Sequence, residues 1–166
     1  TNRWLTCRKR IKSDIYEFKN DIILVKDYSS KKYDQAFREY LIGMLALNSL
    51  RKIIPCFTYT LGLFTYMDDG ESKAGILYEK IEGSSLADMM QDGMTFSTWL
   101  KIFFQIMLSL EVAQRICSFA HYDLHTKNVI VKTYEGNYSV LLDNLSYEIV
   151  QPKLVPELID FGTSSI

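Results

Sequence analysis

The amino-acid sequence predicts an α+β fold that is built from two unlike parts. Up to residue 81 the chain reads as β-strands with a single helix among them, whereas from Thr95 onward a long apolar helix is followed by short strands. A chain of 166 residues can form one domain with a sizeable core, or two small lobes at most.

Two β-hairpins are expected in the first part. Runs of β-branched and aromatic residues predict strands at Ile15–Phe18 and at 22–28. A second pair of strands is predicted at 56–66 and 74–81, and the turn-forming residues 67–70 lie between them.

One helix is expected between the hairpins, over residues 35–49. Asp34 is expected to cap its N-terminus, because an aspartate side chain can accept a hydrogen bond from a backbone N–H of the first turn. Residues that recur at helical spacing are expected to form its apolar face: Phe37, Leu41, Met44, Leu45 and Asn48.

Helices are expected to dominate after a tether at 82–84. Ser85 and Asp88 have the spacing of a capping box and begin a short helix that Gly93 would end. A long helix is predicted over 95–119, buried in a mostly helical layer, and its large side chains are read as core: Trp99, Phe103, Phe104 and Met107. Short strands are predicted after it at 129–132, 138–142, 147–150 and 158–159. The clearest hairpin turn lies at 135–137.

Composition and cysteine usage exclude several classes of protein. The formal net charge of −1 argues against an overall basic nucleic-acid binder, and the basic cluster at 8–12 is expected to be solvated. The three cysteines lack CxxC spacing, which favours a reducing, intracellular compartment over a disulfide framework. The apolar run at 102–110 is shorter than the ~20 residues of a membrane span, so no membrane segment is expected.

The residues suited to catalysis are concentrated after the long helix. Both histidines of the chain, His121 and His125, flank Asp123, and Asn128 follows just before a strand. A carboxylate between a helix end and a strand is a candidate general base, and an amide oxygen can coordinate a hard cation. Asp160 lies at a second strand end, in a turn that a glycine permits. Two acids and an amide at two strand ends predict a site for Mg²⁺ and phosphate.

The segments HYDLHTKN at 121–128 and DFG at 160–162 resemble the catalytic and metal-binding loops of the protein-kinase-like superfamily. The HxDLHxxN form is similar to that of haspin-like kinases. With FREYLIGMLALNSLRKIIPCF at 37–57, the chain looks most like serine/threonine kinases of large nucleocytoplasmic DNA viruses. The resemblance implies a two-lobe fold, with a β-rich N-lobe and helix αC at 1–81, and the hinge and an incomplete, mainly helical C-lobe at 82–166.

The resemblance also implies catalytic roles for individual residues. Lys26, in the strand ILVK, would bind the nucleotide phosphates and would be held by Glu39 of the helix. Asn128 and Asp160 would hold Mg²⁺. Asp123 would accept the proton of the substrate hydroxyl, so the implied activity is phosphoryl transfer from ATP to protein serine or threonine.

Further roles concern the loop and the adenine ring. His125 stands where common kinases have a lysine near the transferred phosphate, whereas His121 is expected to support the loop. Tyr78 would be the gatekeeper, and the backbone that follows it would bind adenine: Glu79, Lys80 and Ile81. The implied ligands are ATP and Mg²⁺, the implied partners are a protein substrate and viral or host proteins, and the implied locations are the host cytoplasm or the virion.

Three departures from the family pattern bear on activity. Tyr122 stands in place of the arginine that reads an activating phosphate, so we expect activity without phosphorylation of a following segment. Asp160 comes 32 residues after Asn128, and an inserted hairpin around 144–156 would explain this interval. No glycine precedes Gly43, and the sequence stops soon after DFG, so the Gly-rich loop and later segments are absent from it. Since every residue to which the resemblance assigns a step of phosphoryl transfer is present, we expect the chain to be a fragment of a longer protein.

Other interpretations are open at this stage. Lys26 and Glu39 could be solvated surface charges. His121, Asp123 and His125 could ligate zinc, although a fourth ligand is not evident. Two other functions compete with a protein kinase: a small-molecule phosphotransferase shares the HxDLHxxN loop, and a catalytically silent pseudokinase could act as a scaffold or virion component.

Overall fold

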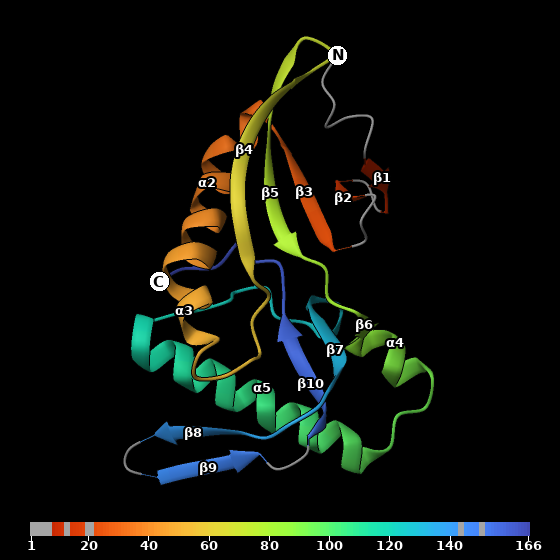
Figure 1. Ribbon diagram of the computed structural model, residues 1–166, viewed down its shortest axis with the longest axis vertical. Helices are drawn as coiled ribbons and strands as arrows, with labels where there is room; N and C mark the ends of the chain where they lie inside the picture. The colour runs from red at the N-terminus through yellow and green to blue at the C-terminus, as the bar shows by residue number, and fades with distance from the viewer. Residues whose placement is uncertain (1–7, 12–13, 19–21, 143–144, 150–151) are drawn as a thin grey trace.

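The structure of the chain is a computed structural model that describes residues 8–11, 14–18, 22–142, 145–149 and 152–166. A five-stranded sheet and the helix beside it form one part of the molecule, in the upper half of Figure 1. The long helix α5 (Phe96–Cys117), a three-stranded sheet and a separate two-stranded hairpin form the other part. The predicted α+β class is confirmed.

The five-stranded sheet is antiparallel and has the order β1-β2-β3-β5-β4. Its strands are β1 (Arg8–Arg10), β2 (Ile15–Phe18), β3 (Ile23–Ser29), β4 (Thr60–Asp68) and β5 (Glu71–Glu79). The first hairpin is therefore where the sequence predicted it, and the turn expected at 19–21 lies outside the described residues. Of the basic cluster at 8–12, the structure describes the backbone of β1 and not its side chains.

The second hairpin is shorter at its open end than predicted. Residues 56–59 do not extend β4, because Phe57 bridges to Leu158 in the other part of the molecule and the Thr58 N–H donates to the Leu158 carbonyl at 3.1 Å. At the closed end, Asp69 and Gly70 have φ angles of 51° and 81°. These two successive left-handed residues form a tight turn that matches the twist of paired strands, within the predicted turn 67–70, whose first two residues belong to β4 instead.

One continuous helical segment lies between the hairpins. It comprises the 3₁₀ turn η1 (Ser30–Lys32), α2 (Tyr33–Leu41), the π-helical turn η2 (Ile42–Leu47) and α3 (Asn48–Leu50). The prediction of Asp34 as the N-cap was wrong, because the 3₁₀ turn moves the start of the helix upstream and places Asp34 inside the first turn of α2.

The predicted apolar face of this segment was also wrong. Phe37 is 44% exposed and Leu45 is 69% exposed. The buried residues of the segment are of mixed size and include one carboxylate: Ala36, Glu39, Ile42, Gly43, Ala46, Leu47 and Leu50. Small residues allow the helix to approach the sheet closely, where Ala36 joins a cluster with Tyr28, Ala74, Ile76 and Tyr78.

Gly43 marks the closest approach of helix and sheet. A Cβ atom at this position would lie 2.8 Å from the Cβ of Thr60 on β4. We expect Gly43→Ala to lower the free energy of unfolding by about 1–3 kcal/mol, measured by urea denaturation, because the extra methyl group overpacks the contact. Gly62→Ala is the control, since its Cβ would meet Leu77 at an ordinary 3.6 Å. Equal stability of the two variants would contradict this packing.

The three-stranded sheet has the order β10-β7-β6 and consists of β6 (Gly83–Ser85), β7 (Val129–Tyr134) and β10 (Lys153–Leu158). The predicted tether at 82–84 is therefore largely a strand. β8 (Tyr138–Leu142) and β9 (Leu145–Ile149) pair with each other. They form the inserted hairpin, which lies earlier than the predicted 144–156. The turn at 135–137 leads from β7 to β8, which are not paired in the described sheets, because β7 pairs with β10 and β6 instead.

The capping box of the short helix α4 (Leu86–Gln91) is present. The Asp88 N–H donates to the Ser85 hydroxyl at 3.1 Å, and that hydroxyl donates to the Asp88 carboxylate at 2.6 Å. Gly93 follows the helix with a left-handed φ of 87° and ends it, as predicted.

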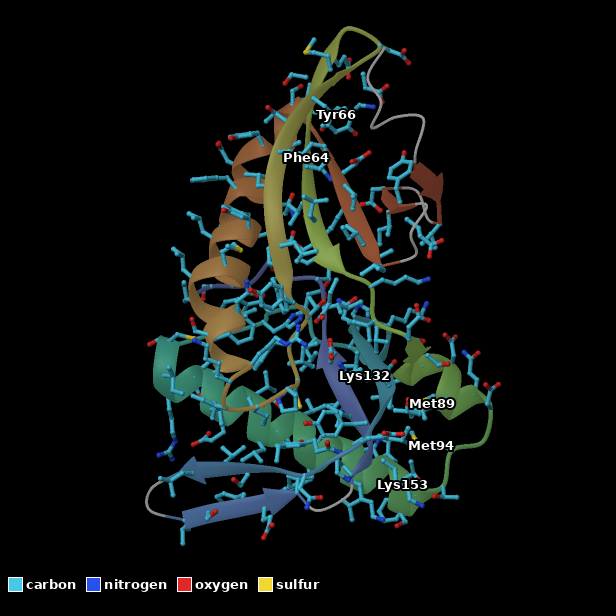
Figure 2. All side chains as sticks on the ribbon, in the orientation of Figure 1. Phe64, Tyr66, Met89, Met94, Lys132 and Lys153 are labelled. Atoms are coloured by element: carbon cyan, nitrogen blue, oxygen red, sulfur yellow. The ribbon has the colours of Figure 1, made fainter. Side chains whose placement is uncertain are left out.

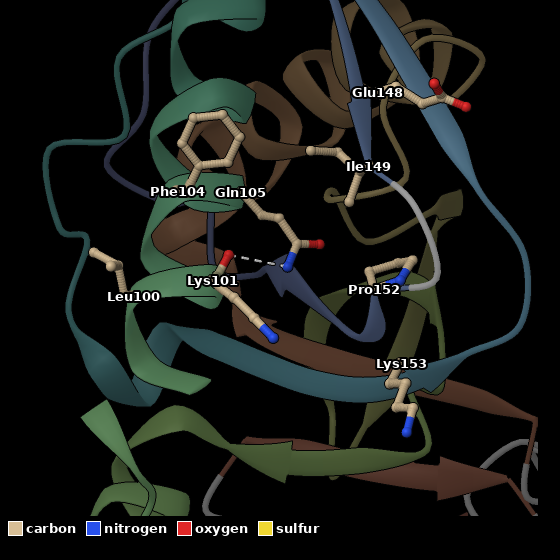
Figure 3. A pocket seen from close by; sticks show the side chains of 8 residues that line it. All are labelled: Leu100, Lys101, Phe104, Gln105, Glu148, Ile149, Pro152 and Lys153. Carbon is tan, nitrogen blue, oxygen red and sulfur yellow. Dashed lines mark hydrogen bonds between the residues drawn. The ribbon is translucent and has the colours of Figure 1, made fainter. Parts of the chain in front are cut away.

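Helix α5 is only partly buried, which corrects the sequence prediction. Phe103, Phe104 and Met107 are each more than 40% exposed. The buried stripe instead includes Gln105, whose amide donates to the carbonyls of Lys101 and Leu154 and accepts from Tyr138. A cavity of about 670 Å³ lies between α5 and the residues around β9 and the start of β10 (Figure 3), and none of the predicted site residues lines it.

The length and composition of α5 also bear on the membrane prediction. At 22 residues the helix is longer than the apolar run at 102–110, and by length and composition alone it could cross a membrane; the expectation of no membrane segment therefore stays a prediction. Core helices of soluble proteins meet the same criterion, and 39% of the most apolar stretch of α5 is buried inside the protein.

Candidate functional site

Lys26 is the centre of the candidate site. It lies on β3, in the middle of the five-stranded sheet, opposite Ile76 of β5. Its ammonium group is 3.2 Å from both carboxylate oxygens of Glu39 and 2.6 Å from Oδ1 of Asp160. The ion pair that was predicted between strand and helix is thus present, and Asp160 joins it from a position 134 residues away in the sequence.

Glu39 faces the sheet and is completely buried. Besides Lys26, two tyrosine hydroxyls donate to it: Tyr28 to Oε2, and Tyr78 to Oε1 at 2.7 Å. A buried carboxylate is tolerated only when charge and hydrogen bonds compensate for its lost hydration. The interpretation of Lys26 and Glu39 as solvated surface charges is therefore wrong.

The charges of the cluster stabilise one another. Burial alone would lower the pKa of Lys26, but attraction by Glu39 and then by Asp160 outweighs it, so the pKa of Lys26 is raised. Burial would likewise raise the pKa of Asp160, but the charge and hydrogen bond of Lys26 hold that pKa below its usual value. Both groups are consequently charged at neutral pH.

The turn that carries Asp160 is fixed by packing behind it. Phe161 is fully buried, with ring centroids 5.8 Å from His121 and 6.1 Å from Phe119. His121 is buried as well, and its Nε2 lies 3.0 Å from the carbonyl oxygen of Ile159. The hydroxyls of Thr163 and Ser164 donate to the His121 carbonyl at 3.1 and 3.2 Å. His121 therefore supports the loop, as expected.

Two non-glycine residues of the site have a left-handed backbone. Tyr122 has a φ of 60°, and Asp160 has a φ of 66°. Such residues cost on the order of 1–3 kcal/mol each and persist where the surroundings enforce them. Here the enforcing contacts include the paired hydrogen bonds between Ala120 and Ser165, at 2.9 and 3.0 Å, which join the two loops.

Asp123, Asn128 and Asp160 are joined through a short chain of hydrogen bonds. The side-chain amide of Asn128 donates to the Asp123 carbonyl at 3.0 Å, and the Asn128 carbonyl accepts from the Ile159 N–H at 3.1 Å. Asn128 is buried, whereas the side chains of Asp123 and Asp160 reach solvent. The side-chain nitrogen of Asn128 thus donates within the protein, and its side-chain oxygen is of the kind that coordinates a hard cation.

His125 caps the 3₁₀ turn η3 (Thr126–Asn128). Its Nδ1 accepts from the Lys127 N–H at 3.2 Å. An imidazole that accepts at Nδ1 carries its proton on Nε2 when neutral, so Nε2–H is the donor that His125 presents to other groups. His121 and His125 therefore make separate contacts, and among the described residues no group of three or more His, Cys, Asp or Glu side chains could hold a metal such as zinc.

The helix α2 is also tied directly to the Asp160 turn. Arg38 donates to the Gly162 carbonyl at 2.9 Å. A Cβ on Gly162 would lie 3.1 Å from Oε2 of Glu39, so the absence of a side chain lets helix and turn approach each other. Arg38 was not predicted as a site residue, because an arginine on a helix gives no local signal of its partner.

The residues predicted to bind adenine lie at the end of β5. Tyr78 is buried and contacts Glu39, as described above. The Glu79 N–H donates to the Tyr59 carbonyl at 3.0 Å, and the Lys80 N–H donates to the Ile22 carbonyl at 2.8 Å. These two N–H groups are occupied within the protein, and a role of Ile81 stays a prediction.

A second charged cluster, missed by the sequence analysis, links this strand end to the three-stranded sheet. Arg51 pairs with Glu79, and its guanidinium lies 4.0 Å from the fully buried Glu157 of β10. Glu157 also pairs with Lys132 of β7, near the middle of the molecule in Figure 2. Burial raises the pKa of Glu157, although Lys132 opposes this shift. The cluster connects both parts of the molecule through the end of β10, the strand that leads to Asp160.

Comparison with known proteins identifies viral relatives. The chain is 36% identical over 148 residues to "Probable kinase 098L" of Invertebrate iridescent virus 3, a match that covers 87% of the chain and 27% of that protein. It is 28% identical over 171 residues to "Uncharacterized protein 179R" of Invertebrate iridescent virus 6, covering 95% of the chain and 14% of that protein. The chain thus spans about a quarter or less of the length of these relatives. No protein-family model matches it.

The first of these relatives, by its name, supports the resemblance to viral kinases in its general form.

Proposed function

We propose that the chain carries the nucleotide-binding and catalytic residues of an enzyme that transfers the γ-phosphoryl group of ATP, with Mg²⁺, to serine or threonine hydroxyls of proteins. The observation that carries the proposal is the contact of one ammonium group, that of Lys26, with both Glu39 and Asp160. The name of the iridovirus relative agrees with this class of reaction.

The donor set fits a magnesium ion bound to a nucleotide. Mg²⁺ prefers oxygen ligands and takes few from protein, and the oxygens of Asn128 and Asp160 are of this kind. In the bound state, Mg²⁺ would neutralise charge on the phosphates. Lys26 would bind and orient the α- and β-phosphates, held by Glu39. Asp123, which is exposed on the neighbouring loop, would accept the proton of the substrate hydroxyl.

Other residues would orient the ligands. His125 would donate from Nε2 to the transferred phosphate, since its Nδ1 is occupied. Tyr78 would close the rear of the nucleotide site, and the backbone of Ile81 would bind adenine together with the carbonyl of Glu79, whose N–H is occupied. Residues 1–81 and 82–166 would form the N-lobe and the hinge with part of the C-lobe of a haspin-like kinase fold. Its partners would be viral or host proteins, in the host cytoplasm or the virion.

The proposal is tested first by binding. We expect Mg²⁺-ATP at about 100 times its Kd to stabilise the chain by about 2.7 kcal/mol, measured as a shift of the thermal unfolding transition, since the ligand binds the folded state alone. Mg²⁺ alone and ATP with EDTA are the controls. An unchanged transition with Mg²⁺-ATP would contradict a nucleotide site.

Transfer is then measured in the complete gene product with radiolabelled ATP and three acceptor classes: Ser/Thr peptides, proteins and small alcohols. Incorporation into Ser or Thr is the expected result. Transfer to small molecules alone would identify a small-molecule phosphotransferase. Binding without transfer to any acceptor would identify a pseudokinase that acts as a scaffold.

A further inference from the structure

The Glu39 carboxylate has more donors than its ion pair with Lys26 requires. Lys26 is 3.2 Å from each oxygen, and in addition the Tyr78 hydroxyl donates to Oε1 at 2.7 Å and the Tyr28 hydroxyl donates to Oε2. Each oxygen therefore has one charged donor and one neutral donor. Since Glu39 is completely buried, no solvent can replace a donor that moves away.

The two tyrosines come from neighbouring strands. Tyr28 lies two residues after Lys26 on β3, so the two side chains point to the same face of the sheet. Tyr78 lies on β5, which pairs with β3, and both tyrosines are at most 9% exposed. The sheet thus presents Lys26 and both phenols to the single helix residue Glu39, on the side of the sheet that α2 covers in Figure 1.

The neutral donors matter because Lys26 is shared. Its ammonium already contacts Asp160 at 2.6 Å, and it would also have to contact phosphate oxygens of a bound nucleotide. When Lys26 turns to these groups, Glu39 loses part of its compensation. Burial raises the pKa of Tyr28 and that of Tyr78, so both phenols stay protonated and remain donors at neutral pH.

We propose that Tyr28 and Tyr78 are positioning residues that hold Glu39, and with it helix α2, against the sheet independently of Lys26. This inference rests on the proposed phosphoryl-transfer function. The two phenols pre-align Lys26 for the phosphates without any phosphorylated segment. Arg38 reinforces the same position of α2 through its hydrogen bond to the Gly162 carbonyl.

The test uses Tyr28→Phe, Tyr78→Phe and the double variant, which remove the hydroxyls and keep the rings. Loss of one hydrogen bond to a charged group is expected to weaken Mg²⁺-ATP binding by about tenfold, and loss of both by up to about 100-fold, measured by isothermal titration calorimetry. In the complete gene product, KM for ATP should rise by a similar factor. The kcat at saturating ATP should stay within about twofold, because bound nucleotide shifts the protein back to the arrangement in which Glu39 and α2 align Lys26.

Tyr66→Phe is the matched control. Tyr66 is also a buried tyrosine of this sheet, on β4, and its hydroxyl donates to the Asp27 carboxylate at 2.6 Å. Figure 2 shows it in the upper half of the sheet. We expect its loss to leave Kd and KM for ATP unchanged. If Tyr66→Phe raised KM as much as the double variant does, a general loss of stability would explain the effect and the inference would fail.

A readout without nucleotide separates this inference from the proposed function. Hydrogen–deuterium exchange of amides 33–50 should become faster in the double variant than in the wild type or Tyr66→Phe, because α2 is then less firmly held. If the wild type bound no Mg²⁺-ATP, the proposed function would be wrong, while this exchange would still test the tyrosine contacts. Unchanged exchange, or a wild-type Kd in the double variant, would overturn the inference.

Discussion

The substitution Asp123→Asn is expected to lower phosphoryl transfer by about 10²–10⁴-fold, the usual contribution of a general base. Its side chain is exposed on the loop that Asn128 holds in place, so an amide of the same size should leave the fold intact. Binding of Mg²⁺-ATP should stay within about twofold, because Asp123 would act on the acceptor hydroxyl and not on the metal. Transfer rates and calorimetric Kd values of the same preparation measure both effects.

The control for this prediction is Asp92→Asn. Asp92 is an exposed acid that follows α4, outside the candidate site, and it also becomes an amide. Wild-type transfer by the Asp123→Asn variant would remove Asp123 from the chemistry. A large loss of nucleotide binding would instead indicate that Asp123, and not Asp160, is the main metal ligand.

The sequence predicted those parts of the structure that depend on neighbouring residues. The Asp69-Gly70 turn and the Ser85–Asp88 capping box were predicted because their signals lie within four residues of one another. The loop from His121 to Asn128 was predicted as a unit for a similar reason, since its histidines, carboxylate and amide lie within one short segment.

The orientation of α2 could not be predicted in the same way. Two stripes of the helix are apolar, and the larger side chains, such as Phe37, favoured the wrong one. The buried stripe contains Glu39 among small and aliphatic residues, and a glutamate at such a position normally indicates a solvated face. Only the donors that the sheet provides make its burial favourable, and these are distant in sequence.

One of the site residues that were not predicted, Tyr28, does have a signal in the sequence. Tyr28 is two residues from Lys26 in a predicted strand, so their common face followed from strand geometry. The Arg51, Glu157 and Lys132 cluster had no such signal, because it joins a helix end to two strands that pair only after folding. Contacts of this kind depend on topology, which local patterns do not specify.

The substitution Asp160→Asn is expected to weaken both nucleotide binding and transfer, in contrast to Asp123→Asn. Asp160 contributes a full negative charge, since the ammonium of Lys26 at 2.6 Å keeps its pKa low, and an amide contributes none. The affinity for Mg²⁺ in the presence of ATP should fall by at least the roughly 10–100-fold that loss of an outer-shell partner of a metal costs. Titration of Mg²⁺ at fixed ATP, followed by thermal unfolding and by transfer rate, measures this loss.

Asp68→Asn provides a matched control for the broken ion pair. Asp68 lies at the far end of the β4–β5 hairpin and pairs with Lys73 at 2.8 Å, so the substitution also removes a carboxylate from a lysine of the same sheet. It should leave Mg²⁺ affinity unchanged. If Asp160→Asn did the same, the contact between Lys26 and Asp160 would be structural and the metal would have to be held elsewhere. A selective loss in Asp160→Asn, beside intact binding in Asp123→Asn, would assign metal binding and proton transfer to two different carboxylates.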